Sequence, residues 1–250
     1  MCNMYNRNRI YITPEEQAAI KHFHIVLAGA GLGSVIAECA LRLGFERITI
    51  VDGDVVEESN LNRQNYTRSD VGMLKVEALK KRLISINPHA EITVFNCFIT
   101  GDTVAPFLRV SHDVKVAINA MDFTSNVPFV FDDCCVSQGI PVLHPYNIGW
   151  ASCVFVVHEM SERLSHISPN PQGFEMQFID WVIQKLAQNG ENTQWLQKLI
   201  EDYKNEEEAL PAPQLSVASW ITAGICTDIL FRLATGKDIK LFPEFYFKQL

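Results

Sequence analysis

A short run of glycines separates an apolar stretch from a helical pattern. Residues 23–28 (FHIVLA) are followed by Gly29, Gly31 and Gly33, and the helical pattern 34–43 begins at Ser34. Glycines let the backbone approach phosphates closely, and the N-terminus of a helix attracts anions. The run predicts a nucleotide-phosphate loop, although an ordinary tight turn between strand and helix is the alternative. Ser34 stands where the dinucleotide motif GxGxxG has its third glycine.

An acidic residue closes the next apolar run. Residues 47–51 (RITIV) are followed directly by Asp52. A carboxylate at the end of the second strand of a nucleotide-binding fold accepts hydrogen bonds from ribose hydroxyl groups. Asp is also frequent in turns, so a purely structural role is the competing interpretation.

Two cations come next. Arg63 lies in Asn60-Leu61-Asn62-Arg63-Gln64, and Lys75 ends Gly72-Met73-Leu74-Lys75. A lone Arg or Lys is usually a solvated surface charge. Placed together after a phosphate loop, these two would neutralise the charge that builds on a triphosphate during group transfer. A dehydrogenase has no need of them, so the pair favours ATP chemistry.

A further carboxylate, Asp122, follows the apolar run 114–120 (VKVAINA). A carboxylate at the end of such a strand can hold Mg²⁺, which takes few protein ligands and otherwise binds phosphate and water oxygens. Capping of a helix over 125–138 is the alternative role.

These strings together resemble a known family. GAGLGS, VDGD, NLNRQ, GMLKVE, INP and AMD look like the ThiF, MoeB and HesA superfamily of adenylating enzymes, to which the ubiquitin-activating enzymes are related. The resemblance covers residues 5–157 closely and 211–247 loosely, and its specific part is NxxRQ in register with GxxK. It implies that a carboxylate, usually the Gly-Gly end of a ubiquitin-like or sulfur-carrier protein or a peptide, attacks the α-phosphate of ATP and releases pyrophosphate.

The resemblance also implies roles for individual residues, with ATP as the nucleotide and Mg²⁺ as the metal ion. The nucleotide-binding set comprises Gly29, Gly31, Gly33, Asp52, Asp54, Asn60 and Gln64. The catalytic set comprises Arg63, Lys75, Asp122 and Arg7, and Asp122 is also the magnesium ligand.

Arg7 is the one member that implies a partner. Tyr5-Asn6-Arg7 resembles the family's N-terminal RYxRQ, whose arginine reaches the ATP of the other subunit. The resemblance therefore implies a homodimer with Arg7 acting in trans. Met4 and Asn8 replace the motif's first Arg and its Gln, and a disordered basic terminus is the alternative.

The chain departs from the family at three points. The zinc-binding CxxC pairs are missing, so we expect no zinc. No cysteine lies between residues 154 and 225, which predicts adenylation without an obligatory enzyme thioester. Phe123 stands where the family has Asn after the magnesium aspartate, so the polar contact of that Asn is lost.

The elements that must position these residues alternate along the chain. Strands are expected at 23–28, 47–51, 91–95, 114–120, 141–144, 151–157 and 239–247. Helices are expected at 34–43, 73–86, 125–138, 174–189, 193–208 and 215–234. Alternation of this kind predicts a doubly wound, Rossmann-like, mostly parallel sheet with helices on both faces. Ligands of such sheets bind beyond the carboxyl ends of the strands, where the candidate residues fall.

We interpret residues 1–250 as a single adenylation domain. Residues 1–157 would form the nucleotide-binding core, 158–210 a helical insertion that covers the site or simply packs on the sheet, and 211–250 a helix and strand that complete the fold.

Composition narrows the setting. The net charge of −8 speaks against a general nucleic-acid binder, which would present a basic face. No stretch approaches the roughly 20 apolar residues of a membrane span, and no signal peptide is visible. Seven cysteines without a CxxC pair suit a reducing cytoplasm.

Three other functions stay open at this stage. One is adenylation of a small molecule or of a tRNA base, as in relatives that dehydrate threonylcarbamoyladenosine. Another is a nicotinamide-dependent oxidoreductase, which Ser34, Arg63 and Lys75 disfavour. The last is a catalytically silent scaffold that binds ATP or a ubiquitin-like protein.

Overall fold

The computed structural model describes residues 4–111, 113–208 and 210–250. Its sheet has seven strands in the order β3-β2-β1-β4-β5-β6-β7. The strands are β1 Ile25–Ala28, β2 Arg47–Val51, β3 Glu91–Phe95, β4 Val116–Asn119, β5 Val142–Ile148, β6 Ala151–Val157 and β7 Tyr246–Gln249. The first five in the chain pair in parallel, whereas β6 and β7 pair antiparallel. The predicted mostly parallel, doubly wound sheet is confirmed.

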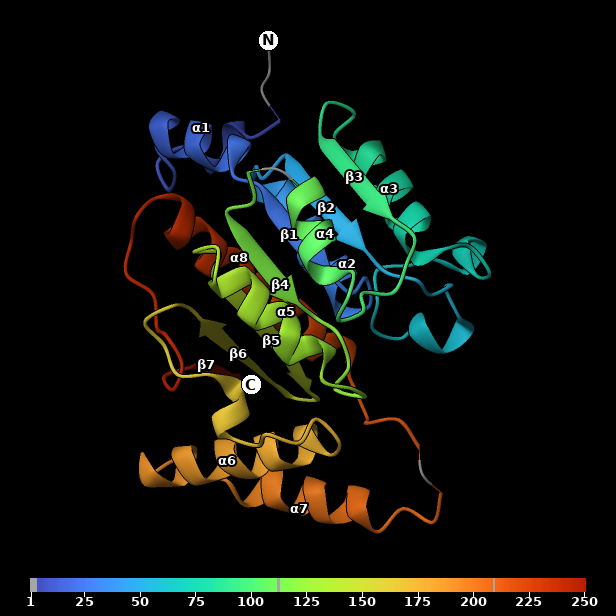
Figure 1. The fold of residues 1–250 in the computed structure, drawn as a ribbon, viewed down its shortest axis with the longest axis vertical. Helices are drawn as coiled ribbons and strands as arrows, with labels where there is room; N and C mark the ends of the chain where they lie inside the picture. The colour runs from blue at the N-terminus through green and yellow to red at the C-terminus, as the bar shows by residue number, and fades with distance from the viewer. Residues whose placement is uncertain (1–3, 112, 209) are drawn as a thin grey trace.

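Helices cover both faces of this sheet (Figure 1). They are α1 Pro14–His22, α2 Leu32–Leu43, α3 Lys75–Ile86, α4 Val104–Val110, α5 Val127–Val136, α6 Phe174–Gln188, α7 Gln194–Lys204 and α8 Ser216–Ala234. One apolar core joins the sheet to α2, α3 and α8, and a second joins it to α4, α5, α6 and α7. Strands β1 and β4 are buried on both faces, which explains why they are almost uniformly apolar.

Two helices and some boundaries differ from expectation. Helix α1 was not predicted, although its start carries the signals of a capping box, with Thr13 and Glu16 bonded reciprocally and Pro14 in the first turn. Helix α4 was also missed. The last strand was expected at 239–247 but lies at Tyr246–Gln249, and α7 ends at Lys204 rather than at 208.

Residues 158–210 are fixed to the sheet by aromatic rings. Tyr146 of β5 stacks on Phe178 of α6 with ring centroids 4.0 Å apart, and Phe155 of β6 meets Phe178 and Trp181 edge-on. In Figure 1, α6 and α7 form a layer below the sheet, beyond β5 and β6. The insertion is therefore packed against the end of the sheet.

Helix α8 departs from the expectation that no stretch suits a membrane. Among the described residues it is the one helix long and apolar enough to cross a bilayer. In this fold it packs beside α2 and against β5 and β6, as a core helix does.

Candidate active site

The glycine loop lies directly against the end of β4. Gly29 has a φ of +98°, and a Cβ atom there would stand 2.5 Å from the carbonyl oxygen of Ala120. A Cβ on Gly33 would meet the Leu27 side chain at 2.8 Å. Side chains at these positions would push the β1–α2 turn away from the neighbouring strand or from its own core. The loop therefore keeps bare backbone at the N-terminus of α2, as a phosphate-binding turn requires.

Ser34 has a role that a glycine would not fill. Its hydroxyl donates to the carbonyl of Gly31 at 2.6 Å and accepts the backbone N–H of Asn65 at 2.9 Å. It thus joins the glycine loop to the segment that carries Arg63. Gln64 lies over Gly31, where a Cβ would come 3.1 Å from its Nε2. The Oε1 atom of Gln64 is buried and has no hydrogen-bond partner among the described residues.

A buried charge cluster anchors the same segment from below. The Glu38 carboxylate of α2 accepts hydrogen bonds from Asn65, from Arg42 at 2.8 Å and from Arg82 of α3. Burial opposes ionisation of this group, but the hydrogen bonds from Arg82, Arg42 and Asn65 outweigh it and lower the pKa of Glu38. The loop with the predicted cation is therefore fastened to two helices.

Asp52 braces two backbone turns. One carboxylate oxygen accepts the N–H of Ala30 at 2.6 Å, and the other accepts the N–H of Asp54 at 2.7 Å. Each carboxylate oxygen has lone pairs left, so these bonds still allow Asp52 to accept a ribose hydroxyl. Residue 52 thus has the structural role, and its binding of ribose stays a prediction.

Lys75 is buried beside this turn. Its Nζ donates to Asp54 at 2.9 Å, and its backbone N–H donates to the carbonyl of Asp54 at 2.9 Å. An isolated antiparallel bridge between Val55 and Leu74 brings the two segments together. The lysine side chain is 10% exposed, so the protein holds its charge in a defined place.

Arg63 is held by three acceptors. Its Nη1 donates to the carbonyl of Ser59 at 2.9 Å and to Asn62 Oδ1 at 2.8 Å, and its Nε donates to Gln214 Oε1 at 2.6 Å. Asn60 is buried and shapes this turn, because its Oδ1 accepts the N–H of Glu57 and its carbonyl accepts the N–H of Arg63.

Asp122 follows β4 in an exposed loop. The protein around its carboxyl group nevertheless raises the pKa of that group by burial. The charge of Lys75 and, more weakly, that of Arg63 lower this pKa, whereas the carboxylates of Asp54 and Asp52 raise it further. The charges of Lys75, Asp54, Asp52 and Arg63 thus reach the carboxyl group of Asp122.

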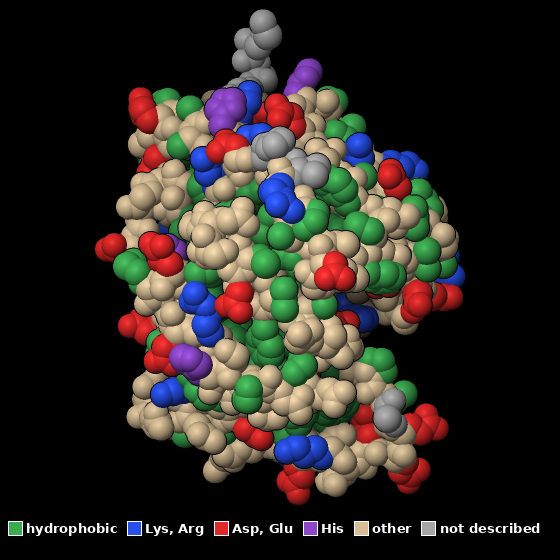
Figure 2. All heavy atoms as spheres, viewed as in Figure 1, with side chains coloured by type: hydrophobic (Ala, Val, Ile, Leu, Met, Phe, Trp, Pro, Cys, Tyr) green, Lys and Arg blue, Asp and Glu red, His purple; other side chains and the backbone are tan. Residues whose placement is uncertain are grey.

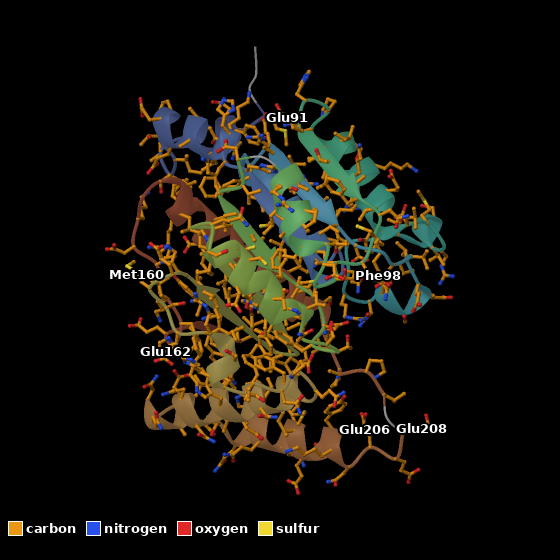
Figure 3. The ribbon with its side chains drawn as sticks, viewed as in Figure 1. Glu91, Phe98, Met160, Glu162, Glu206 and Glu208 are labelled. Carbon is orange, nitrogen blue, oxygen red and sulfur yellow. The ribbon has the colours of Figure 1, made fainter. Side chains whose placement is uncertain are left out.

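The candidate residues that follow β2 and β4 lie at the carboxyl edge of the sheet, above the α6–α7 layer (Figure 1). Figure 2 shows a hollow in the molecular surface between the main body and that layer. Phe98, which follows β3, lies at the same edge in Figure 3, and a Cβ on Gly53 would stand 2.7 Å from its ring.

Phe123 turns away from the site into the aromatic core. Its ring is 5% exposed and stacks on Phe174 of α6 with centroids 4.1 Å apart. Its backbone N–H donates to Glu175 at 3.1 Å. The residue that replaces the family's Asn thus ties the Asp122 loop to the first turn of α6.

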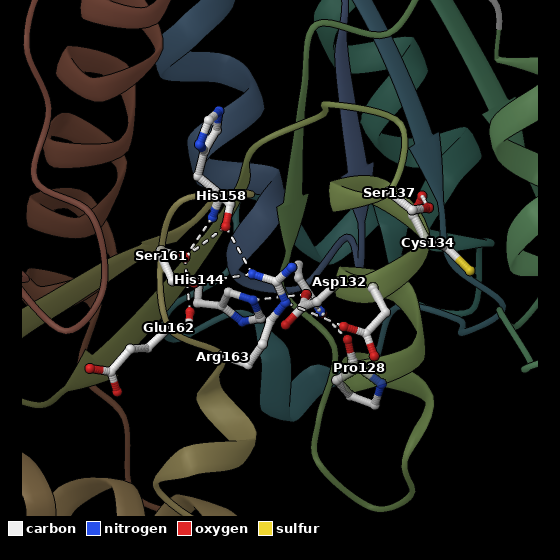
Figure 4. Close-up of polar contacts among 11 residues, drawn as sticks. Pro128, Asp132, Cys134, Ser137, His144, His158, Ser161, Glu162 and Arg163 are labelled. Carbon is white, nitrogen blue, oxygen red and sulfur yellow. Dashed lines mark hydrogen bonds and ion pairs between the residues drawn. The ribbon is translucent and has the colours of Figure 1, made fainter.

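A buried polar chain supports the other side of this loop (Figure 4). Asp132 of α5 accepts hydrogen bonds from Asn119 and from His144 Nε2, each at 2.9 Å, and Asn119 also donates to the carbonyl of Pro128. These contacts fix the ends of β4 and β5 to α5. Next to Asp132, Asp133 pairs with Arg163 at 3.4 Å, which adds a link to the segment after β6.

Arg7 is the predicted site residue that does not join the others. It is exposed in the 3-10 turn Asn6–Asn8, and Asn8 donates to the carbonyl of Leu43 at the far end of α2. Since α2 has 12 residues at about 1.5 Å each, Arg7 lies about 18 Å from the glycine loop of its own chain. Figure 1 shows the N-terminal segment at the opposite edge of the sheet from the site.

The residues present suit ATP and Mg²⁺. Bare glycine backbone and two buried or half-buried cations match a nucleotide with charged phosphates. The unpartnered Oε1 of Gln64 is an acceptor and suits a hydroxyl or amino group of the nucleotide. The described residues contain no cluster of three His, Cys, Asp or Glu side chains. Asp122 alone would be a sufficient protein ligand for Mg²⁺, which is usually held by one or two carboxylates together with phosphates.

Sequence reasoning missed the supporting residues. Gln214, Asp132, His144 and Glu38 carry no motif that distinguishes them, and their partners lie up to 151 residues away in the chain. The sequence showed that Ser34 replaces the third glycine of the dinucleotide motif, but it did not show that this hydroxyl joins the glycine loop to Asn65.

The chain is similar in sequence to a known protein family and to several of its members. The family model described as ThiF family matches residues 5–246. The chain is 33% identical over 163 residues to the sulfur carrier protein ThiS adenylyltransferase of Bacillus subtilis, covering 63% of this chain and 47% of that protein. It is 31% identical over 145 residues to the tRNA threonylcarbamoyladenosine dehydratase of the same organism, covering 57% and 56%. The chain thus spans about half the length of these curated relatives.

Solved structures agree on the fold. The Escherichia coli MccB complex with AMPCPP and MccA has a TM-score of 0.70 at 18% identity, covering 99% of this chain and 71% of that one. The E. coli tRNA threonylcarbamoyladenosine dehydratase TcdA has a TM-score of 0.67 at 21% identity, covering 93% and 94%. With the matched family model spanning nearly the whole sequence, this chain belongs to the ThiF family.

Proposed function

We propose that this protein is an adenylyltransferase that transfers AMP from ATP to a carboxylate and releases pyrophosphate. The observation that carries the proposal is the geometry around the glycine loop at the carboxyl edge of the sheet: Asp52 accepts the N–H of Ala30, Gln64 lies over Gly31, and Lys75 is held by Asp54. A triphosphate explains two positioned cations beside a nucleotide loop better than a nicotinamide does.

The substrate we favour is the C-terminal carboxylate of a ubiquitin-like or sulfur-carrier protein, or of a peptide. Its support is the likeness to proteins named for such substrates, among them a ThiS adenylyltransferase and, at 36% identity over 102 residues, a ubiquitin-like modifier-activating enzyme 5 of Caenorhabditis elegans. The hollow beside the site offers room for an extended tail to approach (Figure 2).

The proposed reaction asks little covalent chemistry of the protein. A carboxylate is already ionised at neutral pH, so no general base is needed. The oxygen of the carboxylate attacks the α-phosphorus, and the bond to the β-phosphate oxygen breaks. Arg63 and Lys75 screen the repulsion of the two anions and stabilise the charge on the leaving pyrophosphate. Asp122 would hold Mg²⁺, which supplies further positive charge at the phosphates when bound.

We also propose a homodimer in which Arg7 completes the site of the partner. Within one chain Arg7 stands at the far end of α2, so it can serve a site only in another copy. Tyr5 anchors the segment, because it is buried and its hydroxyl donates to the carbonyl of Leu41 at 3.3 Å.

In this proposal residues 1–250 act as one adenylation domain of a cytoplasmic enzyme. Residues 158–210 would form the wall of the hollow opposite the cations, since α6 contacts the Asp122 loop through Phe174 and Glu175. A reducing cytoplasm suits the chain's cysteines.

ATP–pyrophosphate exchange tests the activity. Purified protein with Mg²⁺ is assayed against a ThiS-type carrier protein, synthetic peptides with free C-termini and small carboxylates. Arg63→Ala is the test variant, and Arg68→Ala is its matched control, because Arg68 is an exposed neighbour whose side chain pairs with the exposed Glu58. We expect carboxylate-dependent exchange that Arg63→Ala loses and Arg68→Ala keeps.

A second candidate function is activation of a threonylcarbamoyl-adenosine carboxylate in tRNA. The observation in its favour is the likeness to tRNA threonylcarbamoyladenosine dehydratases, including 39% identity over 101 residues with that of E. coli. The acidic net charge of −8 weighs against a tRNA substrate. The same assay with modified tRNA as the carboxylate separates the two functions. A protein that neither exchanges nor binds ATP refutes both.

A further inference from the structure

One contact joins the predicted phosphate cation to a distant segment of the chain. The carbonyl of Ser59 and the side chain of Asn62, which hold Nη1 of Arg63, belong to the cation's own loop. The acceptor of Nε, Gln214, lies 151 residues further on, in residues 210–215 (LPAPQL). This connecting segment leads from α7 into α8.

Gln214 is itself held in place. Its carbonyl accepts a hydrogen bond from Asn62 at 3.3 Å, and the carbonyl of the next residue, Leu215, accepts one from Asn147 at 2.8 Å. Prolines 211 and 213 restrict the backbone just before it. The connecting segment is therefore fastened both to the Arg63 loop and to the end of β5, which gives the side chain of Gln214 a defined position.

The three bonds leave one side of the guanidinium group available. Nε and Nη1 are occupied, whereas Nη2 makes no hydrogen bond within residues 4–111, 113–208 and 210–250. Arg63 directly precedes Gln64, whose side chain lies over Gly31, so this part of the loop stands beside the glycine loop. Because the guanidinium group is planar and rigid, holding Nε and Nη1 fixes the direction in which the two N–H bonds of Nη2 point.

We propose that Gln214 is a positioning residue that holds Arg63 toward the triphosphate. This inference rests on the proposed adenylation function. A neutral amide carbonyl orients the guanidinium group without neutralising it, whereas a carboxylate in the same place would form an ion pair and weaken its pull on phosphate. The connection between α7 and α8 thereby becomes part of the nucleotide site.

The size of the effect follows from the cost of ordering an arginine. An untethered arginine side chain samples many rotamers, and part of this freedom must be lost when it binds a phosphate. A hydrogen bond from a charged donor in a half-exposed place restores part of that loss. We expect Gln214→Ala to weaken ATP binding about 5- to 20-fold.

A double-mutant cycle tests the proposal. ATP dissociation constants are measured by calorimetry for the wild type, Gln214→Ala, Arg63→Ala and the double variant, with Gln188→Ala on the exposed end of α6 as the matched control. We expect the loss from Gln214→Ala to fall below about 2-fold once Arg63 is absent, because its effect passes through that side chain. Equal losses in both backgrounds would mean a merely structural role and would overturn the proposal.

Gln214→Glu supplies a chemical control. Glutamate has nearly the same shape as glutamine, so ATP binding would be restored if the side chain at position 214 only had to occupy space. We expect Gln214→Glu to bind ATP at least as weakly as Gln214→Ala, since its carboxylate would pair with Arg63. Wild-type affinity in this variant contradicts orientation by a neutral acceptor.

A measurement without nucleotide separates this inference from the proposed function. In protein labelled with ¹⁵N-arginine, the Nε–H signal of Arg63, assigned through its absence in Arg63→Ala, should be protected from exchange in the wild type and lose protection in Gln214→Ala. Unchanged protection overturns the tether. If the Nε–H signal is protected by Gln214 but the protein binds no ATP, the contact between the two side chains is real and the proposed function is wrong. The proposed positioning of Arg63 toward a triphosphate is then wrong as well.

Discussion

Replacing Phe123 by alanine should destabilise the protein by about 3–4 kcal/mol. The ring is 5% exposed, stacks on Phe174 at 4.1 Å and lies 5.3 Å from Phe129. Removing about 150 Å² of buried ring surface at about 25 cal/mol per Å² costs about 4 kcal/mol. Residual burial in the unfolded chain reduces this figure by roughly 10–40%, whereas the lost stacking adds about 0.5–1.5 kcal/mol.

Urea unfolding followed by circular dichroism measures this change. The loss is a large part of the roughly 5–15 kcal/mol that stabilises a typical protein. Phe98→Ala is the matched control, because this phenylalanine is 65% exposed at the same edge of the sheet, and it should cost less than about 1 kcal/mol. Hydrogen exchange should also accelerate in residues 120–127 and in the first turn of α6. A loss for Phe123→Ala below 1 kcal/mol, or one equal to that of the control, would refute the view that this ring fastens α6 to the sheet.

Three further predictions concern the loop and its charges. Gly29→Ala should destabilise the fold and abolish ATP binding, because the φ of +98° and a backbone oxygen 2.5 Å away exclude a Cβ atom. In Gly31→Ala the new Cβ atom meets a side chain at 3.1 Å, so this variant should fold. Thermal unfolding of the two variants checks this, and equal melting temperatures contradict it. Lys75→Met should weaken ATP binding about 10- to 100-fold in calorimetry, because a charged hydrogen bond to phosphate is lost. Lys81→Met, on the exposed side of α3, should change the affinity for ATP little, and similar affinities in both variants would exclude Lys75 from the site. Because the pKa of Glu38 is lowered, the stability that its carboxylate contributes is complete above the ordinary glutamate pKa and is lost as pH falls through the lowered value. Glu38→Gln should therefore lower the free energy of unfolding by about 1–3 kcal/mol at pH 7, and the variant should lose less stability on acidification than the wild type. Urea midpoints that fall in parallel for both proteins would contradict this.

The elements of the core could be predicted because their signals are local. Apolar runs such as 47–51 and 91–95 are strands with the expected bounds, and the glycine loop stands between β1 and α2 as its composition indicates. Two elements were missed although one of them, α1, has an explicit capping signal. The final strand was misplaced because its exposed residues lack a clear alternation, and pairing with β6 decides its register.

The positions of the candidate site residues were predictable where these residues follow strand ends. Parallel strands bring their carboxyl ends to one edge, so Asp52 and Asp122 meet the glycine loop once the fold class is known. Arg63 and Lys75 join them through the turns after β2. Arg7 shows the limit of this reasoning, because its motif names a role but only the fold shows that it stands at the opposite edge of its own chain.

The sequence by itself determined the fold class, the nucleotide loop and the two cations, because glycine spacing, apolar periodicity and charge type act over a few residues. Tertiary structure alone decided that Gln214 bonds to Arg63, that Phe123 packs on α6 and that Asp132 joins β4 to β5. The first two contacts join residues about 150 and about 50 positions apart, and Asp132 links two strands through a helix. Which distant side chains meet depends on how the whole chain crosses the sheet, and no short pattern of residues encodes that crossing.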